Sequence, residues 1–312
     1  MLDIHQLNVF LVAAETLNFT QAAVRLHMTQ PSVSQHIQSL ERHFESELFA
    51  RSGRNIELTD AGLALLSFAR EAVSLSIRID ESMASLKGNV IGHLIVVCST
   101  TPGKYTLPQL LARFHHLHPE VRVTCQVTSQ GQGLDMLCDG NAHFAMCSID
   151  NDYCPDVEFE KFLCDSIVLV TPLDHPWASL DEIAPQELCK ADFILREDSS
   201  GTYNAIQRAL AEVGIAMHEL RTLLTLGNSE AIAMAVEEGL GVGFVSEMVA
   251  DKIGDGRLAR IKIKDLKICR DIYIGRNVRR PATIAQTAFW NFLHSEDNPV
   301  SFFLNEEVLD IN

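Results

Sequence analysis

Two clusters of hydroxyl side chains stand where predicted strands give way to helices. Each cluster follows an apolar run that is typical of a buried strand: Ser99, Thr100 and Thr101 form one, and Ser199, Ser200 and Thr202 form the other. The first backbone amides of a helix have no partner inside it, so a hydroxyl beside them completes a set of donors for an anion. Ser129, after a third predicted strand, would add another. Helix capping alone explains one such cluster, but the repetition favours a site for a small anion such as a carboxylate.

A predicted helix after Thr29 carries a different polar surface. Thr29 can cap this helix, and Pro31 falls in its first turn, where a missing N–H costs nothing. Val33, Ile37 and Leu40 recur at helical spacing and should face inward. The candidate contact residues are the cap and the polar side chains of the first two turns: Thr29, Gln30, Pro31, Ser32, Ser34, Gln35 and His36. Such side chains suit hydrogen bonding to base edges in a DNA major groove.

The elements around this helix complete a helix–turn–helix with a wing. A shorter helix precedes it, for which Thr20 is the predicted cap, and Ala22-Ala23 lets the two helices cross closely. Residues 48–59 predict a two-stranded hairpin, in which Arg51 and Arg54 are the candidate phosphate or minor-groove contacts. A helical packing module without a DNA role is the alternative. The hairpin at this distance favours DNA binding.

The run from His5 to Thr59 resembles the winged helix–turn–helix of LysR-type transcriptional regulators. The likeness lies in Phe-Thr-x-Ala-Ala at 19–23, Thr-Gln-Pro-Ser-Val-Ser at 29–34 and Leu-Phe-x-Arg-x-x-Arg at 48–54. It implies promoter DNA as a partner, activation through RNA polymerase, and a homodimer or a homotetramer. Many relatives have Arg where this chain has Gln35. Because Gln pairs with adenine whereas Arg prefers guanine, the DNA half-site is expected to differ.

A long helix is predicted between Asp60 and Lys87, with Thr59 as its cap and Gly88 at its end. Its apolar residues are spaced three or four apart: Leu65, Phe68, Ala72, Leu75, Ile79, Met83 and Leu86. The stripe is narrow, and charged residues occupy the other faces. This pattern is typical of a coiled-coil seam that pairs two DNA-reading heads.

Composition bounds the class of protein. The chain has 312 residues, a net charge of −16 and 47% hydrophobic residues, values that fit two or three globular domains. Residues 1–60 hold four arginines and seven acidic residues, a balance of −3, so DNA affinity from phosphate contacts alone should be weak in one copy. No apolar run is long enough to cross a membrane, and the acidic start is no signal peptide, so a cytoplasmic protein is expected. We expect no cofactor or metal, and the eight cysteines should be reduced, mostly buried thiols.

From His93 onward, strand and helix patterns alternate, which predicts two α/β lobes with a parallel sheet covered on both faces. Residues 270–274 are predicted to return to the first sheet, and 284–293 to form a closing helix. The predicted domains are 1–59, the winged helix–turn–helix, and 60–88, the linker and dimerisation helix. Lobe I would be 89–162 with 268–295, lobe II 163–267, and 296–312 a tail. Ligands of such folds bind beyond the carboxyl ends of the strands, in the cleft.

This half resembles the LysR-type effector domain, a relative of periplasmic binding proteins. The matching runs include Asp139-Gly140-Asn141-Ala142, Ser200-Gly201-Thr202 and 238–243. The fold class is therefore α/β, with an N-terminal winged helix–turn–helix, a long linker helix and a two-lobed periplasmic-binding-protein-like effector domain. The resemblance carries the effector role onto Ser99, Thr101, Ser129, Ser200 and Thr202, with Thr100 and Ser199 as further candidates. The predicted function is a regulator whose effector, a small anionic metabolite, changes promoter binding.

Two other functions are alternatives. Some relatives of this fold switch through a disulfide, but they carry cysteines in the segment that corresponds to 198–203, which has none here. An enzyme with an appended DNA-binding domain is the weaker alternative, since the sequence has no Gly-x-Ser-x-Gly, His-Glu-x-x-His or phosphate-loop motif. Neither displaces a small-molecule sensor.

Overall fold

The computed structural model describes residues 2–52, 55–85, 90–148, 154–279 and 281–300. The chain forms two compact units, Met1–Asn89 and Val90–Asn312. Three predictions fall outside the described residues: the role of Arg54, the helix end at Gly88, and most of the tail.

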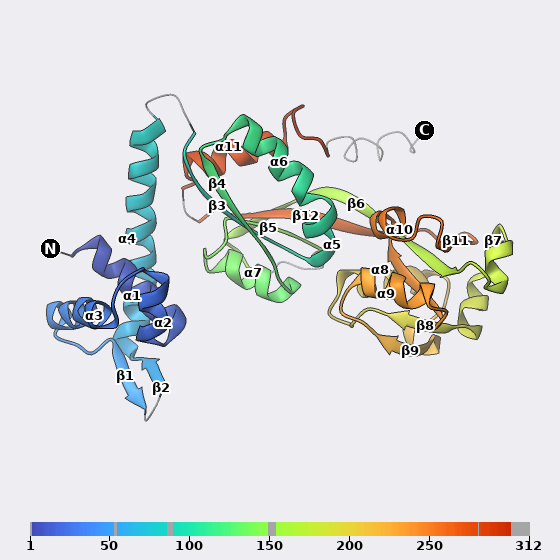
Figure 1. Cartoon of the computed structure of the whole chain (residues 1–312), viewed down its shortest axis with the longest axis horizontal. Coiled ribbons are helices and arrows are strands. Elements are labelled where there is room, and N and C mark those ends of the chain that lie inside the picture. Colours follow the sequence, from blue (N-terminus) through green and yellow to red (C-terminus); the bar gives the residue numbers. More distant parts are fainter. Residues whose placement is uncertain (1, 53–54, 86–89, 149–153, 280, 301–312) are drawn as a thin grey trace. The chain divides into compact units, whose positions relative to one another are not determined.

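The first unit is a winged helix–turn–helix followed by a long helix (Figure 1). Its elements are α1 (Ile4–Thr16), α2 (Phe19–Arg25), α3 (Gln30–Phe44), β1 (Phe49–Ser52), β2 (Asn55–Leu58) and α4 (Asp60–Ser85). The wing is an antiparallel pair in which Phe49 lies opposite Leu58. Val33, Ile37 and Leu40 are buried in its core, as their helical spacing predicted. This confirms the predicted fold of the unit.

The cap of α2 differs from the prediction. Asn18, not Thr20, precedes the helix, and its side-chain Oδ1 accepts hydrogen bonds from the amides of Thr20 (2.9 Å) and Gln21 (3.1 Å). Asn18 has extended backbone angles, whereas Thr20 already lies inside the first turn. The prediction was wrong because two neighbouring residue types could both cap, and the position of the preceding turn decides between them.

Helix α4 begins as predicted, since Thr59 Oγ1 accepts a hydrogen bond from the amide of Gly62 at 3.1 Å. One side of α4 packs on α1, where Ala69 is fully buried. The predicted seam is covered only in part: Leu65 and Ala72 pack against the core of the unit, whereas Phe68, Leu75, Ile79 and Met83 are 49–68% exposed. Exposed apolar stripes of this kind are typical of interaction surfaces.

The second unit begins with β3 (Gly92–Cys98), α5 (Thr100–Tyr105), α6 (Leu107–Leu117), β4 (Val121–Val127), α7 (Gln130–Cys138) and β5 (Phe144–Cys147). It continues through β6 (Val157–Pro172), η1 (Pro176–Ser179), β7 (Glu182–Ile183), η2 (Pro185–Lys190), β8 (Asp192–Leu195), α8 (Gly201–Glu212) and η3 (Met217–Glu219). The last elements are β9 (Arg221–Thr225), α9 (Ser229–Glu237), β10 (Val242–Ser246), α10 (Glu247–Lys252), β11 (Leu258–Ile263), β12 (Ile268–Asn277) and α11 (Ile284–Leu293).

The strands of this unit follow the order β4-β3-β5-β12-β6-β10-β8-β9; in addition, β11 pairs with β6, and β7 pairs with β11. The flanks are parallel, because β3 pairs with β4 and β5, and β8 pairs with β9 and β10. The centre is antiparallel, so the expected parallel sheet is correct only for the flanks. The reason is that β6 leads the chain from lobe I into lobe II and β12 brings it back, so these two neighbouring strands run in opposite directions.

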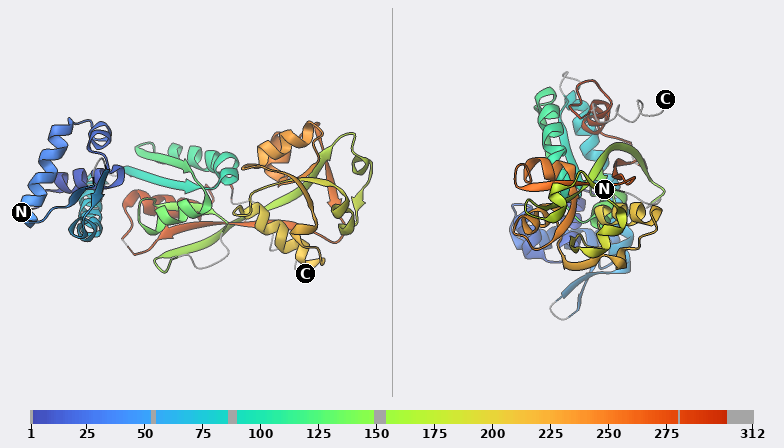
Figure 2. Two further views of the ribbon diagram at one scale, coloured as in Figure 1. Left: turned by 90° about the horizontal axis from the view of Figure 1, so that it is seen from below. Right: turned by 90° about the vertical axis from the view of Figure 1, so that its right-hand side faces the viewer.

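The two largest hydrophobic cores of this unit lie on either side of the central strands. Lobe I has its core between β3, β5, α6 and α11, where Phe289 contacts Phe114 and Phe144. Lobe II has its core between β8, β10 and α8. The predicted return of residues 270–274 to the first sheet is confirmed by the pairing of β12 with β5. Figure 2 shows the long strands β6 and β12 running from one lobe into the other.

Four of the eight cysteines are paired in disulfides, Cys138–Cys154 and Cys164–Cys269, with Cα atoms 6.4 and 6.0 Å apart. The prediction of reduced, mostly buried thiols is therefore wrong for these four. Of the others, Cys98 and Cys147 are buried, whereas Cys125 and Cys189 are exposed. Sequence spacing could not reveal the pairs, because Cys164 and Cys269 meet only through the pairing of strands 105 residues apart.

Candidate functional site

The polar surface of α3 lies where the sequence placed it. Thr29, Gln30, Pro31 and Gln35 are exposed, and Ser32, Ser34 and His36 are half-buried. Thr29 Oγ1 caps the helix by accepting from the amide of Ser32 at 3.4 Å. Gln30 Nε2 donates to Ser34 Oγ at 2.8 Å, and the His36 ring meets the His5 ring edge-on at 5.0 Å. Gln35, in contrast to Gln30 and His36, makes neither of these contacts, and its side chain is exposed.

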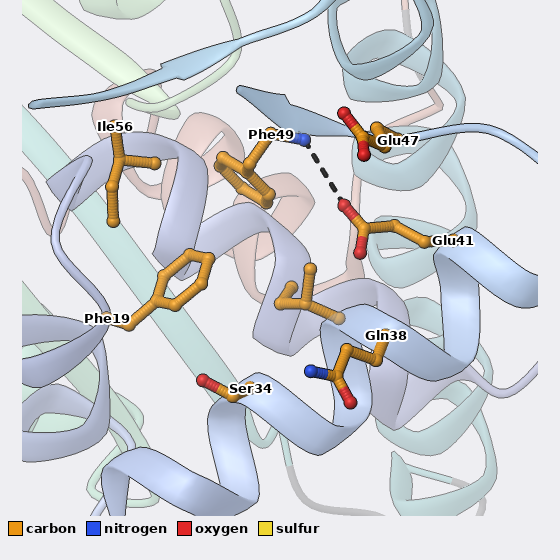
Figure 3. A pocket seen from close by; sticks show the side chains of 8 residues that line it. Phe19, Ser34, Gln38, Glu41, Glu47, Phe49 and Ile56 are labelled. Carbon is orange, nitrogen blue, oxygen red and sulfur yellow. Dashed lines mark hydrogen bonds between the residues drawn. The ribbon is translucent and has the colours of Figure 1, made fainter. Parts of the chain in front are cut away.

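A hollow between α3 and the wing shows how the two are held together (Figure 3). The Glu41 carboxylate of α3 accepts hydrogen bonds from the amides of Leu48 (3.0 Å) and Phe49 (3.4 Å), at the start of β1. The rings of Phe19 and Phe49 meet edge-on at 5.3 Å beside it. None of the eight described residues that line the hollow is basic. The two hydrogen bonds of Glu41 hold the wing against α3. The hollow is not suited to an anion.

The wing itself carries Arg51 on β1, opposite Ile56 on β2. The other predicted contact of the wing, Arg54, lies outside the described residues.

The clusters of hydroxyl side chains meet in one cleft of the second unit, with a volume of about 600 Å³. Six of the seven predicted residues line it: Ser99, Thr100, Thr101, Ser129, Ser199 and Ser200. Thr202 does not line the cleft, because its side chain is fully buried behind it. The cleft has the size of a site for a small metabolite.

Helix starts supply the amides of this cleft. Ser200 Oγ caps α8 by accepting from the amide of Tyr203 at 3.1 Å, and Ser129 Oγ caps α7 by accepting from Gln132 at 3.4 Å. Ser99 precedes α5 and makes no side-chain capping bond. Its hydroxyl is therefore not committed to its own helix, whereas those of Ser129 and Ser200 are shared with capping.

A buried cation lines the same cleft. Arg270, on β12, is 3% exposed and donates through Nη1 to Thr202 Oγ1 at 2.9 Å and through Nη2 to the Asp165 carboxylate. The other Asp165 oxygen accepts from Ser246 Oγ at 2.6 Å. The Nε of Arg270 has no hydrogen-bond partner among the described residues. A buried guanidinium N–H without a partner is unusual in a folded protein, and this one belongs to a side chain that lines the cleft.

A second arginine, Arg196, follows β8 and is 8% exposed. It donates to both carboxylate oxygens of Glu197, at 2.8 and 2.7 Å. These hydrogen bonds hold the pKa of Glu197 below its usual range, so the pair stays charged. Both arginines of the cleft are thus balanced by a carboxylate, which lets them stay charged when buried.

The sequence reasoning missed Arg270, Arg196 and Ser148 as cleft residues. One signal was available for Arg270. In β12 the residues at 268, 270, 272 and 274 are buried, so Arg270 occupies the inward phase of an otherwise apolar alternation. Asp165 occupies the same phase of β6, between Leu163 and Ile167. Opposite charges at inward positions of two strands predict a buried pair.

One group of potential metal ligands exists among the described residues, formed by Cys164, Cys269 and Asp271 within 4.8 Å of one another. The two sulfurs are bonded to each other, and Asp271 forms an ion pair with Lys161 at 3.0 Å. The ligand atoms are therefore already engaged. Among the described helices, none has the length and apolar character needed to cross a bilayer.

Comparisons with known proteins agree with this arrangement. Residues 4–63 match the family model of the bacterial regulatory helix-turn-helix protein, lysR family, and residues 87–298 match the LysR substrate binding domain. The HTH-type transcriptional activator CmpR of Synechocystis sp. is 30% identical over 302 residues, which cover 96% of this chain and 97% of CmpR. An uncharacterized HTH-type transcriptional regulator of Methanocaldococcus jannaschii is 31% identical and covers 91% of this chain and 96% of its own.

Solved structures show the same architecture. A full-length OxyR variant from Pseudomonas aeruginosa superposes with a TM-score of 0.70 at 20% identity, covering 94% of this chain and 93% of that one. The regulatory domain of Synechocystis PCC6803 CcmR, in complex with 2-PG, superposes with a TM-score of 0.60 at 25% identity. It covers 69% of this chain and 99% of that domain.

Proposed function

The chain belongs to the LysR family of DNA-binding transcriptional regulators, and we propose that a small anionic metabolite, bound in the cleft of its effector domain, controls its activity on promoter DNA. It is a regulator and not an enzyme, since its relatives are named transcriptional regulators. The effector would contact Ser99, Thr101 and Ser200, with Thr100, Ser129 and Ser199 around it. Thr202 would act indirectly, by positioning Arg270.

The observation that carries the proposal is the Arg270 guanidinium. It lines the cleft, is 3% exposed, and keeps one N–H without a partner among the described residues. Burying such a donor costs free energy unless an acceptor fills the space beside it. A carboxylate or phosphate oxygen satisfies this donor together with the surrounding hydroxyls and amides. The CcmR regulatory domain was solved with 2-PG, which supports an anion as the class of effector.

Control of DNA binding would run through the two strands shared by the lobes. A ligand shifts a conformational equilibrium only through its differential affinity for the two states. Arg270 lies on β12 and Ser200 at the start of α8 in lobe II, so an anion held by both would favour one arrangement of the lobes. In an oligomer joined through the apolar stripe of α4, the arrangement of the lobes would set the distance between the DNA-binding domains.

The remaining parts of the proposal follow from the family and from the name of one relative. CmpR is named an activator, which supports activation with RNA polymerase as the partner. The uncovered stripe on α4 supports a homodimer, or a homotetramer built from two dimers. A cytoplasmic location is part of the proposal, because bacterial regulators act on promoter DNA in the cytoplasm.

Titration calorimetry on the full-length protein tests the effector site. We expect 2-PG to bind, and Thr101→Val to weaken this binding by roughly 1–3 kcal/mol, because it keeps the shape and removes a donor. Thr225→Val, the same change on the exposed edge strand β9, is the matched control. If 2-PG and a series of small carboxylates and phosphorylated metabolites neither bind nor raise the melting temperature, the anionic effector is wrong.

Selection from a random DNA library tests the DNA-binding residues. We expect residues 1–88 to select a two-part motif as a dimer, because two paired heads read two half-sites. Arg51→Ala and Arg54→Ala should weaken all sequences about equally and reduce the salt dependence of binding. Recovery of no two-part motif would contradict the proposal.

A further inference from the structure

The Cys164–Cys269 disulfide lies at the junction of the two lobes. It joins β6 to β12, and each cysteine directly precedes a member of the buried ion pair, Asp165 on β6 and Arg270 on β12. In the register of the two strands, Arg270 lies opposite Asp165, and Cys269 lies opposite Ser166. We call residues 163–167 of β6 and 268–272 of β12 the neck.

The disulfide and the ion pair occupy opposite faces of the neck. Successive side chains of a strand point to opposite faces. Accordingly Asp165 and Arg270 are buried, whereas Cys164 is half-buried and Cys269 is exposed. The same two strands are therefore linked covalently on the outer face and electrostatically on the inner face, at the same level. A change in one link alters the spacing and twist that the other requires.

The chain enclosed by this disulfide is lobe II. Its cysteines are 105 residues apart and enclose β8, α8, β9, α9 and β10. The other disulfide, Cys138–Cys154, has a separation of 16 residues and stays within lobe I. Only the first of these two bonds therefore constrains how lobe II leaves and rejoins lobe I.

From this placement we propose that Cys164–Cys269 is a thiol–disulfide exchange site that sets the anion affinity of the cleft through the position of Arg270. The effect on anion binding rests on the effector function proposed above; the exchange and its effect on the neck do not. The partner in the exchange is a low-molecular-weight thiol and its disulfide, such as glutathione. In a reducing compartment such a bond forms under oxidising conditions and acts as a switch.

The chemistry begins at the exposed sulfur. An external thiolate attacks Sγ of Cys269, which forms a mixed disulfide and releases the Cys164 thiolate, and this takes up a proton. A second external thiolate attacks the external sulfur of the mixed disulfide and releases Cys269, which is protonated in turn. In sum, one protein disulfide and two external thiols become two protein thiols and one external disulfide. Oxidation is the reverse, with the external disulfide as the two-electron acceptor.

The test uses the full-length protein in oxidised and reduced form, with Cys164→Ser as the variant and Cys154→Ser as the matched control for the other disulfide. Hydrogen–deuterium exchange of the neck amides is measured without effector. Exchange should be faster in the reduced wild type and in Cys164→Ser than in the oxidised wild type, and unchanged in oxidised Cys154→Ser. Calorimetry with 2-PG should show a roughly five- to tenfold loss of affinity in the same two samples, the size of a typical coupling between sites.

Each outcome bears on the proposal. Unchanged exchange at the neck after reduction overturns it, whether or not 2-PG binds. Faster exchange with the same 2-PG affinity in all four samples overturns the link to the cleft. If 2-PG binds to none of them, the proposed effector class is wrong, and the exchange data alone then decide whether the neck responds to reduction.

Discussion

Arg270 and Asp165 form an ion pair between the two strands that connect the lobes, and their side chains are 4% and 1% exposed. Both side chains are almost wholly buried, so water can replace a missing partner only poorly. Two residues of lobe II each add one hydrogen bond to the pair: Thr202 accepts from Arg270, and Ser246 donates to Asp165. The Arg270 guanidinium thus lies at the cleft, at the neck and at the start of α8.

Removal of one partner should be costly. Arg270→Met leaves the Asp165 carboxylate buried and uncompensated, so we expect the free energy of unfolding to fall by about 3–5 kcal/mol. The double variant Arg270→Met/Asp165→Leu should recover most of this loss, because an apolar pair needs no compensation. Denaturant unfolding measures both variants. A double variant as unstable as the single one would contradict this account.

Glycine at position 201 should be required for the geometry of the cleft. A Cβ there would lie 2.6 Å from Ser148 Oγ and 3.2 Å from Arg270 Cδ, so Gly201→Ala must displace one of them. We expect the affinity for 2-PG to fall about tenfold or more, equivalent to about 1.4 kcal/mol. Gly227→Ala is the control, since Gly227 lines the same cleft and a Cβ there meets nothing within 4 Å. Equal affinities in the two variants would place the effector elsewhere.

Much of the fold was predictable because it depends on local patterns. The spacing of apolar residues placed the core of α3, and the closing helix begins and ends at the predicted residues 284 and 293. The cap of α2 was not fixed by the pattern, because Asn18 and Thr20 are both good capping residues. The direction of the central strands also needed tertiary information, since β6 and β12 lie far apart in the sequence.

The candidate site was predictable in its hydroxyls and not in its charges. Ser99 and Ser200 each follow a strand, a position visible in the sequence, and the fold brings them into one cleft. Arg270 and Asp165 become cleft and neck residues only because their strands are neighbours. The inward phase of each charge was a signal for burial, but it did not identify the partner.

Acid should destabilise the effector domain through His143. Burial, followed by the nearby His93, lowers the pKa of His143 to about 4, and its Nδ1 accepts a hydrogen bond from the amide of Ile95 at 3.1 Å. The unfolded chain protonates this residue near pH 6.5, whereas the folded protein keeps it neutral. The free energy of unfolding is therefore unaffected by the titration of His143 above pH 6.5. It falls by on the order of 3 kcal/mol as the pH decreases towards 4, because only the unfolded chain takes up the proton.

Unfolding measured between pH 7 and 4 checks this sign. His143→Asn keeps an acceptor for the Ile95 amide and does not titrate, so its stability should fall less steeply over that range. Parallel curves for the two proteins would show that other groups control the response to acid.

Base reading should depend on Gln35 more than on other polar residues of α3. Gln35 is exposed in the second turn, and a bidentate contact from such a side chain to one base is worth about 1–3 kcal/mol. Gln35→Ala should lose this amount at one base position per half-site, whereas His43→Ala, at the far end of α3, should leave specificity unchanged. Competition binding against DNA sites with single substitutions measures both. An equal loss at every position would assign Gln35 to the phosphates.

The insertion of lobe II between β6 and β12 also sets an order of synthesis. The last residue of the lobe II core is Ile268, at the start of β12, whereas lobe I still lacks the rest of β12 and its covering helix α11, which ends at Leu293. Domains generally fold as units while the chain emerges from the ribosome. The lobe that comes first in the sequence is therefore the last to be completed. Its strands β3 and β5 stay incompletely covered until β12 is synthesised, more than a hundred residues later.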